Sequence, residues 1–114
     1  MTKLAGVAKL RAAMIELEGD LGLKALSQNE RDVLYAFEEA GGGDTFVSSD
    51  TVRHCSIVSG MAHATFHRAL RSLLESGHIE HAPNSRTKHY RLSERATGRV
   101  PGNKESPPNE VREA

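Results

Sequence analysis

The chain has 114 residues, 15 Lys and Arg against 15 Asp and Glu, and a single Cys. This length allows one small domain with an extension but excludes two independent cores, and one Cys excludes an intrachain disulfide and is typical of a reducing compartment. The sequence also lacks a run of about 18 apolar residues and an apolar signal-peptide region, which argues against a membrane partner and predicts a cytoplasmic protein.

The first predicted element is a helix over residues 3–18. Its apolar residues recur at alternating spacings of three and four, which is the a/d pattern of a helix that packs along another helix. These residues are Val7, Leu10, Met14, Leu17 and Leu21. The helix either folds back onto its own domain or forms a homodimer. We favour the homodimer, because a small domain has little surface to spare for so long a stripe, and we take residues 1–25 as an N-terminal extension.

The second predicted helix begins at the capping box Ser27-Gln28-Asn29-Glu30, in which the Ser27 hydroxyl accepts from the Glu30 amide and the carboxylate reaches back. Three glycines at 41–43 end this helix. Its apolar face comprises Val33, Leu34, Phe37 and Ala40. A short strand at 45–47 and a short helix around 50–56 follow, and either Ser48 or Ser49 can serve as the N-cap of that short helix.

The third predicted helix of this domain runs from about Met61 to Ser76, and Gly77 ends it. Its buried face is predicted to contain Ala62, Phe66, Leu70 and Leu73, and its exposed face His63, His67, Arg68 and Arg71. A hairpin then follows, with strands at 78–82 and 87–92 around a turn at 83–86. Alternation along the second strand predicts that Tyr90 and Leu92 point inward and that His89 and Arg91 point outward.

Residues 95–114 have few groups that could form a core. Val100 and Val111 are their only large apolar side chains, among Pro, Gly, Asn, Lys and Glu. Such a segment cannot bury enough apolar surface to offset the entropy lost on ordering. We therefore predict a disordered C-terminal tail, which leaves residues 26–94 as a mainly helical α+β domain with a small β-hairpin.

Residues 26–94 resemble the winged helix-turn-helix transcriptional regulators of bacteria, the MarR type most closely. The resemblance is carried by the capping box Ser27–Glu30, by Thr65-Phe66-His67-Arg68-Ala69-Leu70, by Leu74-Glu75-Ser76-Gly77-His78-Ile79-Glu80 and by Tyr90-Arg91-Leu92-Ser93. It implies a homodimer that reads a pseudo-palindromic double-stranded DNA site. The helix at 61–76 would enter the major groove, and the wing at 78–92 would lie on the backbone or in the minor groove.

The charge distribution is compatible with DNA binding although the net charge is zero. Residues 53–91 contain six Lys and Arg against two Asp and Glu, together with all six His. Arg68 and Arg71 share one exposed face, and an Arg fork can bond guanine O6 and N7 together. The predicted DNA contacts on the third helix are His63, Ala64, Thr65, His67, Arg68 and Arg71. Those on the wing are Arg86 and Lys88, and those on the short helix, for a phosphate, are Ser49, Thr51 and Arg53.

Two other functions compete with DNA binding. The neutral charge also suits a winged helix used as a protein-protein interaction module of a larger assembly. The i, i+4 spacing of His63 and His67, with His54-Cys55 nearby in sequence, suggests a metal-responsive regulator. However, neither suitably placed carboxylates nor a Cys pair accompanies them, so we expect no metal and no other cofactor. No phosphate loop, nucleophile elbow or metalloprotease motif occurs, so we expect no enzyme activity, and no pattern identifies a small-molecule effector.

Overall fold

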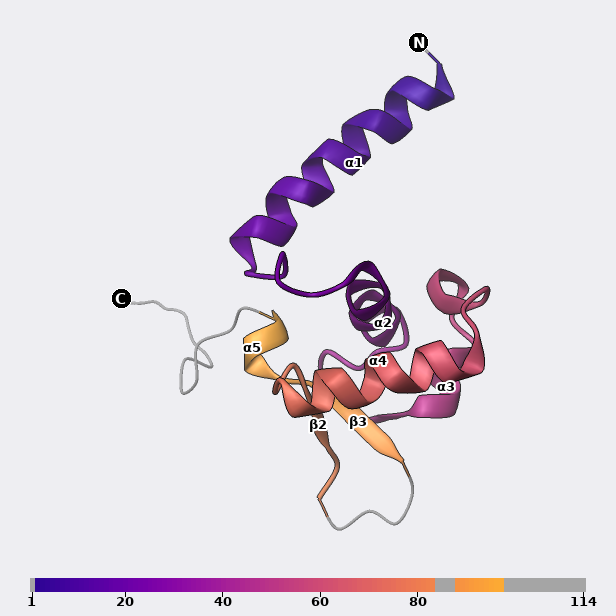
Figure 1. The fold of residues 1–114 in the computed structure, drawn as a ribbon, viewed down its shortest axis with the longest axis vertical. Helices are drawn as coiled ribbons and strands as arrows, with labels where there is room; N and C mark the ends of the chain where they lie inside the picture. The colour runs from indigo at the N-terminus through magenta and orange to yellow at the C-terminus, as the bar shows by residue number, and fades with distance from the viewer. Residues whose placement is uncertain (1, 84–87, 98–114) are drawn as a thin grey trace, which may run out of the picture.

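The computed structural model describes residues 2–83 and 88–97. In these ranges the chain is mostly helical with a three-stranded antiparallel sheet, which confirms the predicted α+β class (Figure 1). The elements are α1 (Lys3–Asp20), α2 (Gln28–Glu39), β1 (Val47–Ser48), α3 (Ser49–Arg53), the 3-10 turn η1 (Ser56–Val58), α4 (His63–Glu75), β2 (Ile79–His81), β3 (His89–Leu92) and α5 (Glu94–Thr97). In the described part of the chain, none of the helices is both long and apolar enough to cross a membrane.

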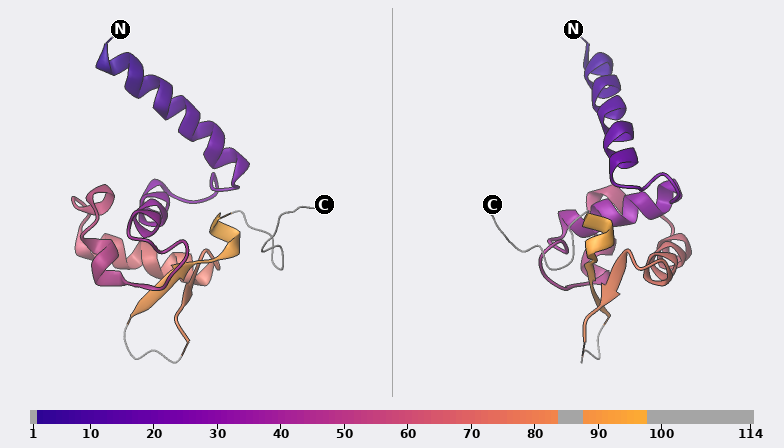
Figure 2. Two further views of the ribbon diagram at one scale, coloured as in Figure 1. Left: turned by 180° about the vertical axis from the view of Figure 1, so that it is seen from behind. Right: turned by 90° about the vertical axis from the view of Figure 1, so that its left-hand side faces the viewer.

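Helix α1 projects away from the rest of the molecule in all three views (Figures 1 and 2). Thr2 caps its N-terminus, and within α1, all of which the structure describes, Glu18 is the one buried residue. Glu18 accepts a hydrogen bond from the Tyr35 hydroxyl of α2, and Arg31 Nε lies 3.8 Å from the same carboxylate. The apolar side chains of α1 remain exposed. Among the described residues, the apolar stripe of α1 does not pack onto the rest of the domain.

Helix α2 starts at the predicted capping box. Ser27 Oγ accepts from the Glu30 amide at 3.2 Å, and the Ser27 amide donates to Glu30 Oε1 at 2.8 Å. Its buried residues are Val33, Leu34, Ala36 and Phe37, whereas Ala40 is only half-buried. Gly41, at φ +92°, ends the helix in a conformation that favours glycine.

The sheet has the order β1-β3-β2 among the described residues. Val47 lies opposite Tyr90, and Ile79 lies opposite Leu92. The first strand begins two residues later than the predicted 45–47. The reason is that Thr45 belongs to the turn after α2, where its amide and its hydroxyl both donate to the Gly41 carbonyl.

The core lies between α2, α4 and the inner face of the sheet. Helix α4 contributes Phe66, Ala69, Leu70 and Leu73 to it, and β3 contributes Tyr90 and Leu92, as predicted. The prediction that Ala62 is buried is wrong, because α4 starts at His63 and Ala62 is its exposed N-cap residue. Gly77 ends α4 with φ +82°, as predicted.

Three other predicted boundaries change. The short helix at 50–56 is instead α3, capped by Ser48, followed by η1. The strands are shorter than predicted. Residues 84–86 of the predicted turn, Thr87 of the predicted second strand and residues 98–114 of the predicted tail lie outside the described residues. Residues 95–97 belong to α5, in which Ala96 is buried, so the prediction of disorder is wrong for these three residues.

Candidate nucleic-acid interface

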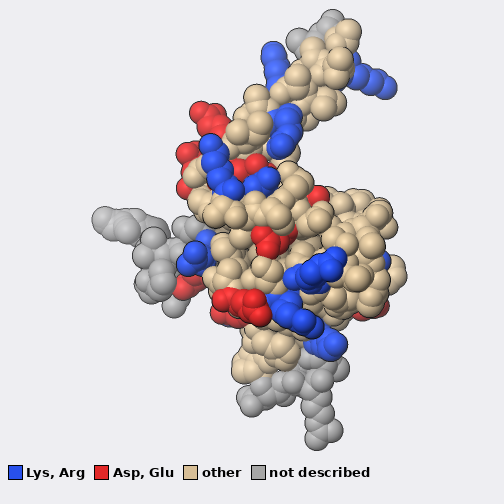
Figure 3. Space-filling model, viewed as in Figure 1, with Lys and Arg blue, Asp and Glu red and all other residues tan. Residues whose placement is uncertain are grey.

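The exposed face of α4 follows from its buried one. Because Phe66, Leu70 and Leu73 face the core, the helical period turns Arg68 and Arg71 to the surface. His63 and Ala64 are exposed as well, and Thr65 and His67 are half-buried. Figure 3 shows Lys and Arg side chains gathered over α4. All six residues predicted on this helix therefore lie on, or at the edge of, one surface.

The N-terminus of α4 adds a partial positive charge to this surface. Ala62 is the N-cap residue, and no side chain in the described part of the chain caps this end. The amides of the first turn of a helix have no carbonyl partner within the helix, and the helix dipole makes this end positive. The backbone at His63, Ala64 and Thr65 is therefore suited to an anion.

Basic residues of α3, of α4 and of the loop before β3 are close enough to His67 to lower its pKa. Burial lowers the pKa of His67, and the neighbouring charges of His63, Lys88, Arg53 and Arg71 lower it further. The rings of His63 and His67 have their centroids 4.3 Å apart. We call these five residues the basic cluster. Like charges placed so close together destabilise the protonated imidazole, and an anion bound among them would relieve that repulsion.

Two tertiary contacts bring Arg53 and Lys88 to α4. The Arg53 guanidinium, from α3, lies 5.6 Å from the centroid of the Phe66 ring. The Lys88 carbonyl, just before β3, accepts a hydrogen bond from the Ser49 amide at 3.0 Å, and the Lys88 side chain is exposed. The loop end of β3 is therefore fastened to the start of α3, the helix that also carries Arg53.

The other predicted contacts are Ser49, Thr51 and Arg86. Ser49 is buried, with 9% of its surface exposed, so its side chain is not on this surface. Thr51 is exposed, and its hydroxyl lies 2.8 Å from that of Ser48, the residue that caps α3. Arg86 lies outside the described residues. Ser48 and Ser49 both precede the short helix, and the sequence pattern does not determine that Ser48 is its cap.

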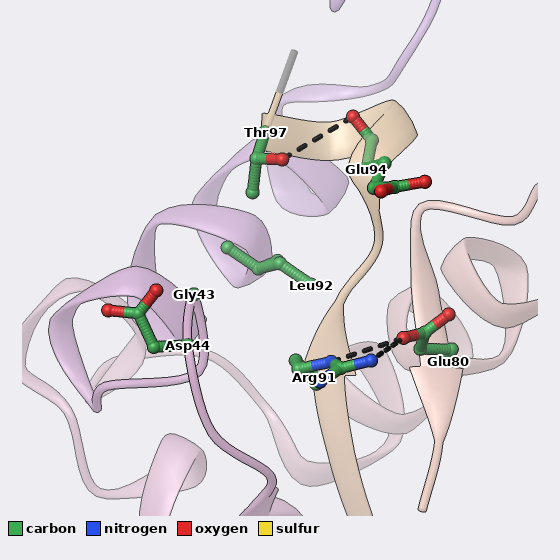
Figure 4. A pocket seen from close by; sticks show the side chains of 7 residues that line it. All are labelled: Gly43, Asp44, Glu80, Arg91, Leu92, Glu94 and Thr97. Carbon is green, nitrogen blue, oxygen red and sulfur yellow. Dashed lines mark hydrogen bonds and ion pairs between the residues drawn. The ribbon is translucent and has the colours of Figure 1, made fainter. Parts of the chain in front are cut away.

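Arg91 does not belong to the basic cluster. It was predicted to point outward, but it is half-buried and its Nε donates to Glu80 at 3.1 Å (Figure 4). Its guanidinium also lies 4.5 Å from the centroid of the Phe46 ring. The Glu80–Arg91 pair lines a hollow of about 470 Å³ that also contains Asp44 and Glu94. The ion pair follows from the pairing of β2 with β3, which places Glu80 opposite Arg91.

The histidines have different environments. His78 is the first residue of the predicted strand 78–82, but it precedes β2, is 5% exposed, and its Nδ1 lies 2.6 Å from Ser76 Oγ. Burial lowers the pKa of His78, and the charge of Arg95 adds to this effect. Among the described residues, no three His, Cys, Asp or Glu side chains lie close enough together to hold a metal ion. His63 and His67 thus form a pair without a third ligand in these ranges.

No protein-family model, curated protein or solved structure matches this chain.

Proposed function

We propose that this chain is a cytoplasmic winged-helix protein that binds double-stranded DNA and regulates transcription. The observation that carries the proposal is the basic cluster around His67, contributed by α3, α4 and the residue before β3, next to the uncapped N-terminus of α4. In this proposal α4 lies in the major groove, and the β2–β3 hairpin is the wing that follows the backbone or the minor groove. The role is binding rather than catalysis.

The order of elements supports this proposal. Helix α2, strand β1, helices α3 and α4 and the β2–β3 hairpin follow one another as in winged helices, and β1 pairs with β3 at the sheet edge. The 13 residues of α4 span about 20 Å, and its exposed face from His63 to Arg71 could lie along a groove while Phe66, Leu70 and Leu73 stay in the core. Arg68 and Arg71 would then be the residues closest to base edges.

The charge separation explains how a neutral chain could bind a polyanion. The acidic groups Asp44, Glu80 and Glu94 line the hollow beside β3, and Glu80 is already paired with Arg91. Glu30 is engaged by Ser27 and Ser72. The charged groups that shift the pKa of His67 are all basic. A local positive surface of this kind attracts phosphates whatever the net charge.

Binding to a fluorescent random duplex, measured by anisotropy at several salt concentrations, tests the proposal. If four phosphates are contacted, the affinity should fall on the order of 100-fold between 50 and 200 mM salt. The variant Arg68→Ala/Arg71→Ala should bind much more weakly. The matched control Lys24→Ala/Arg95→Ala removes the same charge from exposed positions outside α4 and should bind like the wild type.

Selection of bound duplexes from a random pool then tests sequence preference. If the folded protein binds no duplex at low salt, the proposal fails. A protein-interaction module, which the neutral net charge also suits, would then be favoured.

A further inference from the structure

The apolar stripe of α1 has no cover in the described part of the chain. Val7 is 60% exposed, Leu10 69% and Leu17 59%, and Met14 and Leu21 lie on the same stripe. Contiguous apolar surface of this kind on a small protein marks an interaction site. The a/d spacing of these five residues further indicates that the partner is another helix, because side chains at this spacing interlock with those of a facing helix.

Charge is segregated along the same helix. The first half contains Lys3, Lys9 and Arg11 without an acidic residue, and the second half contains Glu16, Glu18 and Asp20 without a basic one. Figure 3 shows blue side chains toward the N-terminal end of α1 and red ones nearer the rest of the molecule. A helix with this distribution is complementary to a reversed copy of itself.

We propose that a second copy of this chain covers the stripe and that the two α1 helices pair antiparallel. Glu18 is buried and paired with Arg11 and Arg31 of its own chain, so Glu16 and Asp20 are the exposed carboxylates of the second half. In a parallel pair the cations of the two first halves would lie side by side, and so would these exposed carboxylates. In an antiparallel pair each positive half faces the negative half of the other copy, and the two helix dipoles oppose each other favourably. Homodimerisation was expected from the sequence pattern, and the charge distribution adds the orientation.

The stripe also defines a register. Matching apolar layers places Val7 of one copy against Leu17 of the other and Leu10 against Met14. Gly6 and Ala13 flank the stripe, and such small side chains allow the two backbones to approach closely. Lys3 at one end of the stripe then lies next to Leu21 and Asp20 of the other copy.

The anchor of α1 is compatible with this pairing. Glu18, which holds α1 against α2 through Tyr35 and Arg31, lies beside the stripe and not within it, so the exposed residues remain accessible. The two compact units then stand at opposite ends of the helix pair. Their α1 ends are separated by about 24 Å, from 16 residues at 1.5 Å each. The pairing itself does not depend on DNA binding. Binding of the two units to DNA half-sites one helical turn apart is a separate expectation, and it rests on the proposed function.

The assembly is tested first by sedimentation of the full chain and two variants. The wild type should be a dimer, and Leu10→Asp should be a monomer because it places a charge in the middle of the stripe. Ala12→Asp is the matched control, since Ala12 lies on the opposite side of α1 and is exposed. It should remain a dimer. A monomeric wild type, or a dimer that Leu10→Asp leaves intact, would overturn the proposal.

The orientation is tested by disulfide formation between two variants in a Cys55→Ser background. Val7→Cys and Leu17→Cys chains, mixed and oxidised, should form a mixed disulfide. Neither should crosslink well alone, because identical positions of an antiparallel pair lie about 15 Å apart along the axis, beyond the reach of a disulfide. Efficient crosslinking of each variant with itself, without the mixed product, would show a parallel pair and overturn the orientation. Neither result depends on whether the chain binds DNA.

Discussion

Ser72 Oγ in α4 donates a hydrogen bond to the Glu30 carboxylate in α2, at 2.5 Å. The other carboxylate oxygen of Glu30 accepts from the Ser27 amide and so completes the capping box. One side chain therefore both starts α2 and joins it to the helix with the exposed arginines. The hydrogen bond from Ser72 lowers the pKa of Glu30, and the bond from the Ser27 backbone lowers it further.

The first prediction concerns this link between α2 and α4. Ser72→Ala should lower the free energy of unfolding by about 1 kcal/mol, because Glu30 loses one hydrogen bond in a partly buried place. Urea denaturation would measure the change. Ser59→Ala is a suitable control, since Ser59 is exposed and its hydroxyl donates to the Ser56 carbonyl of its own turn. Equal losses in the two variants would contradict the importance of the interhelical bond.

A second prediction concerns acid stability. The pKa of Glu30 is lower in the folded protein than its ordinary value of 4.5, so the ionised carboxylate stabilises the fold above that pH. This stability is lost as the pH falls below about 4.5 and through the folded pKa. Glu30→Gln should be less stable than the wild type at neutral pH, and the difference should shrink in acid. Thermal unfolding at several pH values would measure it, and a difference independent of pH would contradict the assignment.

The local elements were largely predictable, and the tertiary pairs were not. The capping box at Ser27, the buried residues of α4 and the glycine at 77 depend on neighbours within a few residues, so spacing and propensity are enough to predict them. The burial of Glu18 depends on Tyr35 and Arg31, and the pairing of Arg91 depends on Glu80 across the sheet. Helical or strand periodicity identifies a face but not what covers it.

The same limit applies to the candidate site. The exposed residues of α4 follow from its apolar face, and their positions agree with the prediction. The meeting of Arg53 and Lys88 with α4 depends on the hydrogen bond from the Ser49 amide to the Lys88 carbonyl and on the contact between Arg53 and Phe66. Both are long-range contacts between residues that the sequence separates by more than ten positions.

The third prediction concerns sequence recognition. Arg68→Ala should cost about 1–3 kcal/mol on a selected duplex and relax specificity at one base position. Arg68→Lys keeps the charge but loses the bidentate fork, so it should retain binding to random duplexes and lose preference for the selected one. Lys88→Ala should weaken binding to all duplexes about equally and reduce the salt slope by about 1. Equal effects of Arg68→Ala on selected and random duplexes would contradict base reading by Arg68.

The fourth prediction concerns the pH dependence of DNA binding. Burial and the neighbouring cations hold the pKa of His67 below 6.5 in the free protein. Phosphate would favour the protonated imidazole, so binding should raise this pKa and take up a proton. Affinity for a duplex should therefore increase as the pH falls toward the free pKa and level off below it. His67→Gln should flatten this dependence.

Anisotropy titrations in the presence of a chelator would measure that effect. His54→Gln is the matched control, because His54 is exposed at the end of α3 and should not change the pH dependence. If affinity is independent of pH in the wild type but responds strongly and reversibly to zinc, a metal-responsive regulator would be favoured over the present assignment of His63 and His67.

Helix α1 is attached to the rest of the molecule near its C-terminus, so a small change of its tilt moves its N-terminus by several times more. The helix is about 27 Å long, from 18 residues at 1.5 Å each, and Glu18 near its C-terminus is its buried anchor. A tilt of 10° about that anchor moves the far end by roughly 5 Å over this length. Small rearrangements among Glu18, Tyr35 and Arg31 would therefore cause larger displacements at Thr2. In the proposed dimer, these contacts would affect the distance between the two copies.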